Sequence, residues 1–530
     1  MRAFVDKQPT RKKLFSEIHI SEDVDIWSID VHGVIIRCAK VHNPVVLTKP
    51  ESNVWTELVG VQRLEIEDPE ATQSTIPKQI VTELRSLESL SITWTKIKSL
   101  PASLFRLPLK SLYLQRNQIK KIDGIEKASA LTILDISNNC LHALPRTFGV
   151  LQNLVNLNLS GNGLHELPDS VGSLSRLKTL DCSCNKLRSL PNSIGNIIEL
   201  TSLDVSTNQL TSLPESIGSL ARLEDLRARS NQLSSLPSSF GDLARLSSLL
   251  LRNNRFVDVP EQLSHLSGLQ SLNLRENVIT HMDRPVASLK YLILDQNRLQ
   301  QIDVGILQCA NLQYLSLRSN GIVEVTGTVG RLANIRSLNL SDNAIADVPA
   351  ELQHLTQLRH LSLCSTEIRT VPLAIARMPT LKTLALDDCA KLDRYLGIAY
   401  KDKGLPGVVD YLQRNAPTEQ AILRPSSTRR SKTIETIYPL TGDDAVDRNP
   451  AGNGVEIRNM AGLSIVPGTS VEPPAEEAML QVIDLKHLYV LDAARIVCGA
   501  VSMQRSSVRP SVRLSVPSID SSNGGRRVCC

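Results

Sequence analysis

The sequence predicts an α/β solenoid, a horseshoe of stacked repeats with a parallel β-sheet on its concave face. The main observation is a motif of 23 residues, L-x-x-L-x-L-x-x-N-x-L-x-x-L-P-x-x-I/V-G-x-L-x-x, which recurs almost unbroken through residues 131–248. Its L-x-L segment suits a short strand, because alternate side chains of a strand point to opposite faces. Aromatic residues make up only 3% of the chain, as expected where aliphatic ribs pack on their neighbours alone.

This pattern resembles that of leucine-rich repeats. We expect about 14 such repeats to form the solenoid over residues 87–394. Successive repeats begin 22 residues apart for the first two steps and 23 apart afterwards, except for one step of 20. The repeats begin at Leu87, Leu109, Leu131, Leu154, Leu177, Leu200, Leu223, Leu246, Leu269, Leu289, Leu312, Ile335, Leu358 and Leu381.

Residues 1–86 follow the repeat less closely and are expected to form a small β-rich N-terminal cap. Residues 18–20 and 26–36 are rich in β-branched side chains that partly alternate, with His32-Gly33 as the expected turn. Residues 61–66 resemble one degenerate repeat. A cap is expected because a solenoid exposes its core at each open end.

A capping helix within residues 395–416 is expected to close the other end, because residues 407–414 carry apolar side chains at helical spacing. Residues 417–530 are rich in Ser, Pro, Gly and charge and predict a mostly disordered tail. Charged residues interrupt the apolar stretch over 476–503, which argues against a membrane span there.

One Asn follows the strand in most repeats. The turn at this point buries backbone polar groups, which need hydrogen-bond partners, and an Asn amide offers both donors and an acceptor. The motif's Pro suits an extended convex segment, and its Gly allows a tight return into the next repeat. Thr366 and Cys389 replace the Asn in the last two repeats. The Asn column comprises Asn117, Asn139, Asn162, Asn185, Asn208, Asn231, Asn254, Asn277, Asn297, Asn320 and Asn343.

The 20-residue repeat from Leu269 to Leu289 lacks the Leu-Pro and the Gly, so we expect its convex side to be pinched. Two interpretations remain open. The shorter repeat is either a harmless deletion or a bend between two binding surfaces.

Charge and cysteine usage narrow the class of protein. The net charge of +5 is small for 530 residues and does not call for a nucleic-acid partner. The ten cysteines form no paired end clusters, and the first residues lack the apolar core of a signal peptide. These features predict a reducing, cytoplasmic location.

Catalytic and metal-binding motifs are missing from the sequence. It contains no phosphate-binding G-x-x-x-x-G-K-[ST], no H-E-x-x-H and no G-x-S-x-G. Cys182-x-Cys184 has no second pair with zinc spacing. The sequence therefore predicts no enzymatic activity, cofactor or metal site.

The positions in and just after L-x-L face the concave side and vary between repeats. Three of them, Arg229, Arg252 and Arg275, share one column in consecutive repeats, so their guanidinium groups are expected to span roughly 10 Å. Arginine pairs with carboxylates and phosphates, so we expect an acidic or phosphorylated partner, with a basic end over the acidic column. The alternative is a solvated surface partly neutralised by Asp225, Glu276 and Asp295. The expected partner-binding residues are Arg227, Arg229, Arg252, Arg275 and Arg318, with the acidic column Asp135, Asp181 and Asp204.

Two features of the tail suggest modification. Ser431 and Thr433 follow a basic pair of the kind that many Ser/Thr kinases prefer, so they are candidate phosphosites. The final Cys529 and Cys530 resemble the doubly prenylated ends of Rab-type GTPases and are candidate lipidation sites. A membrane partner is expected only if these cysteines carry lipids.

The 23-residue type with S-L-P-x-S-I-G-x-L, over residues 131–380, resembles the intracellular Ras-group leucine-rich repeat proteins, which include the animal Ras–Raf scaffold. The repeat at Leu109 is similar instead to the type of a phosphatase-regulating family. The resemblance implies a non-catalytic scaffold or adaptor in signal transduction, with a small GTPase or a Ser/Thr phosphatase as partner. Two alternatives are a regulatory or targeting subunit of a phosphatase or ubiquitin ligase, and a structural protein tethered to membrane by its tail.

Overall fold

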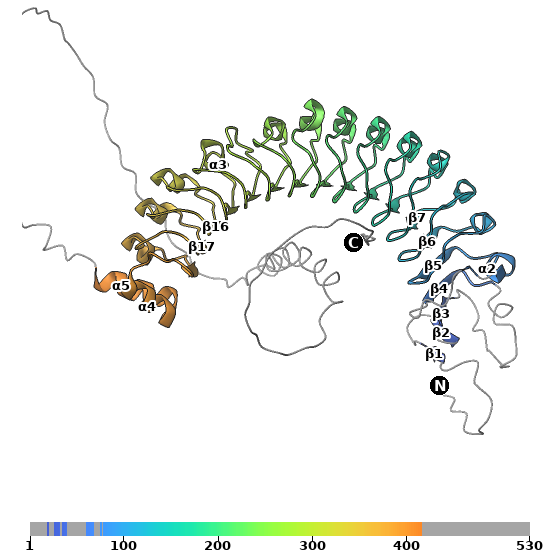
Figure 1. Cartoon of the computed structure of the whole chain (residues 1–530), viewed down its shortest axis with the longest axis horizontal. Coiled ribbons are helices and arrows are strands. Elements are labelled where there is room, and N and C mark those ends of the chain that lie inside the picture. Colours follow the sequence, from blue (N-terminus) through green and yellow to red (C-terminus); the bar gives the residue numbers. More distant parts are fainter. Residues whose placement is uncertain are drawn as a thin grey trace, which may run out of the picture. The chain divides into compact units, whose positions relative to one another are not determined.

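The computed structural model describes residues 18–20, 26–31, 34–39, 60–67, 75–76 and 78–415. Within them an 18-stranded sheet follows the inner side of an arched stack of repeats, and short helices lie on the outer side (Figure 1). From β4 onward each strand pairs in parallel with the next. The predicted solenoid with a parallel concave sheet is confirmed.

The N-terminal end of the sheet is antiparallel, which confirms the β-rich cap. Strand β1 (Ile18–Ile20) pairs with β2 (Ile26–Val31), β2 pairs with β3 (Val34–Ala39), and β3 pairs with β4 (Arg63–Glu67). Val31 pairs with Val34, so the expected turn residues lie between them, outside the described residues. The degenerate repeat over 61–66 supplies β4, the first parallel strand.

The remaining strands begin two residues after the start of each expected repeat. The second residue of every one is a buried leucine that lies in register with the same leucine of its neighbours, so burial fixes the register of the whole sheet. They are β5 (Ser89–Thr93), β6 (Ser111–Tyr113), β7 (Ile133–Asp135), β8 (Asn156–Asn158), β9 (Thr179–Asp181), β10 (Ser202–Asp204), β11 (Asp225–Arg227), β12 (Ser248–Leu250), β13 (Ser271–Asn273), β14 (Tyr291–Ile293), β15 (Tyr314–Ser316), β16 (Ser337–Asn339), β17 (His360–Ser362) and β18 (Thr383–Ala385).

The convex side is built mainly from single turns of 3₁₀ helix that follow the Leu-Pro of each repeat. The Gly of the motif lets these turns touch: a Cβ on Gly195 would lie 2.2 Å from the carbonyl oxygen of Ser216. The helices are α2 (Lys78–Thr82), η1 (Leu104–Arg106), η2 (Ile125–Lys127), η3 (Phe148–Val150), η4 (Asp169–Ser173), η5 (Asn192–Asn196), η6 (Glu215–Ser219), η7 (Ser238–Asp242), η8 (Glu261–His265), α3 (Val304–Leu307), η9 (Gly327–Arg331), η10 (Ala350–His354) and η11 (Leu373–Arg377).

The Asn column forms a ladder between repeats, as the sequence predicts. The Nδ2 group of Asn231 donates to the carbonyls of Val205 and Ala228, at 2.9 and 3.2 Å, and its Oδ1 accepts from the N–H of Leu210 at 3.0 Å. In the last two repeats Thr366 and Cys389 each donate to the carbonyl of Leu363 instead. The residue before each of these positions lies in the left-handed region, which the sequence did not reveal.

The 20-residue repeat has no helix on its convex side between β13 and β14. Helix α3 of the next repeat fills the space, and a Cβ on Gly305 would lie 2.3 Å from the carbonyl oxygen of Met282. The buried Asp303 accepts a hydrogen bond from the N–H of Met282 at 2.8 Å. Leu272 still pairs with Leu292, so the parallel register continues through the deletion.

Two helices close the C-terminal end where one was expected. They are α4 (Arg394–Lys403) and α5 (Leu405–Arg414), separated by Gly404 in a positive-φ conformation. The Asp393 carboxylate starts α4 by accepting from the N–H of Leu396 at 2.9 Å and from the Tyr411 hydroxyl of α5 at 2.8 Å. These bonds hold the pKa of Asp393 below its ordinary value, with the Leu396 N–H as the larger cause.

Candidate functional site

The acidic column lies at the ends of neighbouring concave strands. Asp135 ends β7, Asp181 ends β9 and Asp204 ends β10. In the sheet register Asp181 lies directly opposite Asp204, and Asp204 lies opposite Arg227 on the next strand. Parallel strands are about 4.8 Å apart, so the two carboxylates are close neighbours of like charge.

These carboxylates also have a local structural role. Each accepts a hydrogen bond from the N–H two residues later: Asp181 from Ser183 at 2.8 Å and Asp204 from Ser206 at 2.8 Å. Asn158 does the same for Ser160 at 3.0 Å. This column was expected to vary between repeats; at these three positions the side chain also serves the scaffold, because Asp or Asn satisfies the turn. The recurring D/N-x-S was the signal in the sequence.

The acidic column faces an open hollow of about 270 Å³ on the concave side. Tyr113 lines one end and Arg227 the other, and polar side chains from the strands between them complete the wall. The described residues form no ion pair with Asp135, Asp181 or Asp204, whereas Arg227 already binds Asp225 at 2.8 Å. The hollow therefore presents carboxylates that this part of the chain leaves available for hydrogen-bond donors and cations.

The environment of the hollow shifts the pKa of the Asp204 carboxyl group. Burial raises the pKa of Asp204 above its ordinary value, and repulsion by Asp181 raises it further. The Ser206 N–H and the charge of Arg227 act in the opposite direction. Deprotonation of Asp204 is thus less favourable in the folded protein than in the unfolded chain.

We expect Asp204→Asn to stabilise the solenoid at neutral pH by about 0.2–1 kcal/mol, because it keeps the turn acceptor and removes a like-charge pair. A carboxyl whose native pKa is raised favours folding when protonated, so the gain should vanish below the unfolded pKa of about 3.9. Urea denaturation at neutral and acidic pH measures the difference. Asp135→Asn, whose neighbour Asn158 donates to it at 3.2 Å, is the control and should bring no gain. Equal gains in both variants, or a gain that persists at acidic pH, would contradict this.

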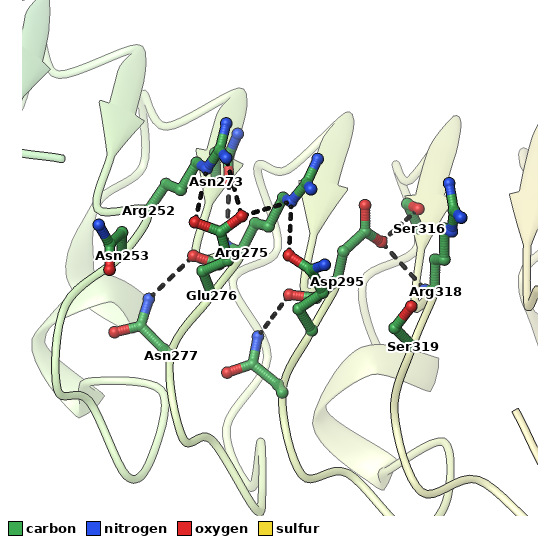
Figure 2. A network of polar contacts seen from close by, with 12 residues as sticks. Arg252, Asn253, Asn273, Arg275, Glu276, Asn277, Asp295, Ser316, Arg318 and Ser319 are labelled. Carbon is green, nitrogen blue, oxygen red and sulfur yellow. Dashed lines mark hydrogen bonds and ion pairs between the residues drawn. The ribbon is translucent and has the colours of Figure 1, made fainter. Parts of the chain in front are cut away.

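The arginine column is compensated within the fold. Arg252 forms a bidentate pair with Glu276 of the next repeat, with Nε–Oε2 at 3.1 Å and Nη2–Oε1 at 2.7 Å. Arg275 reaches the same carboxylate at 3.3 Å and the amide oxygen of Gln296 at 3.1 Å (Figure 2). Glu276 therefore neutralises both Arg252 and Arg275, as the alternative of a partly neutralised surface expected of that residue.

The remaining concave arginines differ from one another. Arg318 pairs with Asp342, and this hydrogen bond lowers the pKa of Asp342, with burial opposing it. Asp295 does not neutralise an arginine by direct contact. Its carboxylate instead accepts hydrogen bonds from the Ser316 hydroxyl and the Arg318 N–H, which both belong to the next repeat. Among the residues that the structure describes, no carboxylate forms an ion pair with the guanidinium of Arg229, which leaves it as the available cation of the column.

The structure describes the Cys182–Cys184 segment but not the candidate modification sites of the tail. Cys182 is buried and Cys184 exposed, and the described ranges contain no group of three His, Cys, Asp or Glu that could hold a metal ion. Ser431, Thr433, Cys529 and Cys530 lie outside the described residues. Among the helices within residues 60–415, none is long and apolar enough to cross a membrane.

Comparison with known proteins supports the repeat assignment. A profile described as a leucine-rich repeat region matches residues 108–209 and 192–284, and a leucine rich repeat profile matches residues 287–345. No curated protein matches the chain. Neither profile distinguishes the Ras-group type from other leucine-rich repeats.

Solved structures show the same fold. An internalin from Listeria monocytogenes is 20% identical with a TM-score of 0.50, over 64% of this chain and 91% of that one. A leucine-rich repeat protein of Leptospira interrogans is 30% identical with a TM-score of 0.62, and the alignment covers 70% of this chain and 94% of that protein. This chain belongs to the leucine-rich repeat family.

Proposed function

We propose that this protein is a binding scaffold whose concave hollow receives a basic segment of a partner protein. The observation that carries the proposal is the pair Asp181 and Asp204, directly opposite each other at the hollow, with no ion pair to either within the described residues. Leucine-rich repeat solenoids are generally protein-interaction scaffolds. A Lys or Arg side chain between the two carboxylates would relieve their repulsion and add charge-assisted hydrogen bonds.

Charge on the rest of the concave face sets the partner's orientation. Arg229 lies one strand beyond Asp204, two residues after Arg227, and none of the described carboxylates forms an ion pair with it. A partner with a basic side chain over the hollow and an acidic or phosphorylated group over Arg229 would match both. Such complementarity raises association rate and specificity more than affinity.

Selection of peptides by the purified full chain tests the proposal. Wild type is expected to select peptides with Lys or Arg next to an acidic position. The double variant Asp181→Asn with Asp204→Asn keeps the turn hydrogen bonds and should bind the selected peptides at least about tenfold more weakly, which corresponds to about 1.4 kcal/mol. The matched control is Asp123→Asn with Asp283→Asn, two exposed carboxylates on the convex side. Equal affinity in wild type and the concave variant would refute the site.

The cellular role that fits this binding is a cytoplasmic scaffold or adaptor in signal transduction, with a small GTPase or a Ser/Thr phosphatase as the partner. Affinity pull-down with wild type and with Arg229, Arg252 and Arg275 each changed to Glu measures which proteins depend on the concave face. Recovery of a GTPase by wild type alone supports the scaffold role. Recovery of a phosphatase catalytic subunit or of ubiquitin-ligase components supports a regulatory subunit, and recovery of neither contradicts both.

A further inference from the structure

A second charged surface lies on the edge of the solenoid between the concave strands and the convex helices. After each strand, the Asn and the next Leu of the motif point inward, so the residues that alternate with them point outward. In the five repeats that begin between Leu87 and Leu177, the position three residues after the Asn, or after Thr95 in the first repeat, is Lys, Arg or His each time, and four further outward positions are Lys or Arg. We call this surface the basic lateral face; it comprises the exposed Lys96, Lys98, Arg116, Lys120, Lys121, His142, His165, Lys186 and Arg188.

The outermost column of this face changes character along the stack. It is Lys98, Lys120, His142, His165 and Arg188 in five consecutive repeats. The following repeats have Thr211, Ser234, Val257 and Thr280 at the same position. Glu166 is the one acidic residue among the outward positions of the five repeats. The charge is therefore concentrated at the N-terminal third of the solenoid and is not a general property of the repeat.

The two lysines and the arginine of this column also lack the compensation found elsewhere in the protein. On other columns, exposed cations pair with a carboxylate of the previous repeat: Lys110 with Glu88 at 2.8 Å and Arg284 with Glu261 at 3.2 Å. Within the described residues, no such pair involves any member of the basic lateral face. Like charges stacked without partners reduce stability, so an external anion would relieve them.

The spacing of one stacked pair in the column matches that of alternate residues in an extended peptide. The Lys120 N–H contacts the Lys98 carbonyl oxygen at 3.4 Å, so neighbouring members are adjacent. The rings of His142 and His165 stack with centroids 6.4 Å apart and planes at 21°. An extended peptide rises 3.2–3.4 Å per residue, so its alternate side chains recur at about 6.4–6.8 Å. Carboxylates at every second residue of an extended chain would thus meet successive members of the column.

An aromatic anchor lies at the N-terminal end of the same face. Arg116 places its guanidinium carbon 3.8 Å from the ring centroid of Trp94, and Trp94 is 56% exposed. Both residues lie in the left-handed region, Trp94 at φ 57° and Arg116 at φ 61°, so the turns of two neighbouring repeats hold them outward. Exposed Trp and Arg side chains are the types most enriched where binding energy is concentrated.

We propose that the basic lateral face binds an extended acidic protein segment with carboxylates at alternate positions, running across the five repeats and ending against Trp94. This surface is separate from the concave hollow, and its partner carries the opposite charge. The two surfaces can therefore hold two proteins on one solenoid.

Fluorescence anisotropy with the full chain and a labelled peptide of alternating Glu and Ser tests this inference. We expect the triple variant Lys98→Glu, Lys120→Glu and Arg188→Glu to bind at least about tenfold more weakly than wild type. The matched control reverses three exposed arginines elsewhere on the edge, with the same change in net charge, and should stay within about twofold. The control substitutions are Arg255→Glu, Arg298→Glu and Arg369→Glu.

Further measurements distinguish a site for an alternating acidic segment from general attraction between opposite charges. A peptide of the same composition with its Glu residues contiguous should bind more weakly, and Trp94→Ala should weaken binding of the alternating peptide. Equal losses in both triple variants, or equal affinity for the two peptides, would overturn the proposal.

Tighter binding of oligothymidylate, lost in the first triple variant, would replace it with a nucleic-acid site. Asp181→Asn with Asp204→Asn should leave this binding intact, so failure of the concave site is distinguished from failure here.

Discussion

Replacement of Asn231 by Ala is expected to lower the free energy of local unfolding by about 2–4 kcal/mol. The substitution leaves several buried backbone groups without a hydrogen-bond partner at once. The amide of this buried side chain bridges two repeats: it donates to the carbonyls of Val205 and Ala228 and accepts from the N–H of Leu210. Repeat arrays need not unfold in one step, so amide hydrogen exchange is the measurement. The amide of Leu210 should exchange much faster in the variant.

Asn334→Ala is the matched control for this prediction. Its exposed amide makes a single hydrogen bond between repeats, to the carbonyl oxygen of Ala310 at 2.8 Å, where water can replace it. We expect a change within about 0.5 kcal/mol. Similar losses of stability from the two substitutions would show that burial does not determine how much the hydrogen bonds of the Asn ladder stabilise the fold. An effect of Asn231→Ala confined to its own repeat would likewise contradict the bridging role.

The ladder shows why so much of this fold follows from the sequence. The inward Leu and Asn of each repeat make the same contacts with the neighbouring repeats all along the stack. A recurring pattern of Leu and Asn in the sequence therefore specifies the strand, the turn and the register together. The left-handed residue before each Asn was not predicted, because residues as different as Arg116, Thr207 and Glu276 occupy it. Glycine or asparagine favours a positive φ, and of these repeats only those with Asn138, Gly161 and Asn253 have one there. Here the hydrogen bonds on both sides impose that conformation on residues that do not favour it.

The binding surfaces were less predictable for the same reason. Outward side chains make no contact that recurs in every repeat. The sequence therefore shows which positions form a column, but not which side chains pair with them. Arg252 was correctly placed on the concave side, yet its pairing with Glu276 depends on rotamers that bring residues 24 positions apart into contact. The partner of Arg318, Asp342, was missed entirely, and it also lies one repeat further on. Glu276 was expected only as part of a general neutralisation; comparing charges between adjacent repeats, rather than within one column, would have paired it with Arg252 and would have found Asp342.

The C-terminal cap illustrates a different gap. Helix α5 was expected because its buried Val408 and Leu412 recur at helical spacing, whereas α4 fully buries only Leu396 and half-buries Tyr400. The available signal for α4 was Asp393 as its N-cap and Gly404 at its end. Periodicity alone could not detect a helix that packs mainly against another helix rather than against the core.

We expect Val408→Asp to unfold this cap, because it places an uncompensated charge where no solvent reaches, at a cost of more than about 3 kcal/mol. Val408 lies on α5, which packs against α4 and η11. The side chain of Gln413 is exposed on the same helix, so Gln413→Asp is the matched control. In a solenoid each repeat is stabilised mainly by its neighbours, so the loss should spread inward from β18 and fade. Hydrogen exchange should accelerate in β17 and β18 and remain unchanged in β5 to β10. Uniform acceleration across the repeats would show that the stack unfolds as a single unit, and no acceleration would show that α5 does not cap the core.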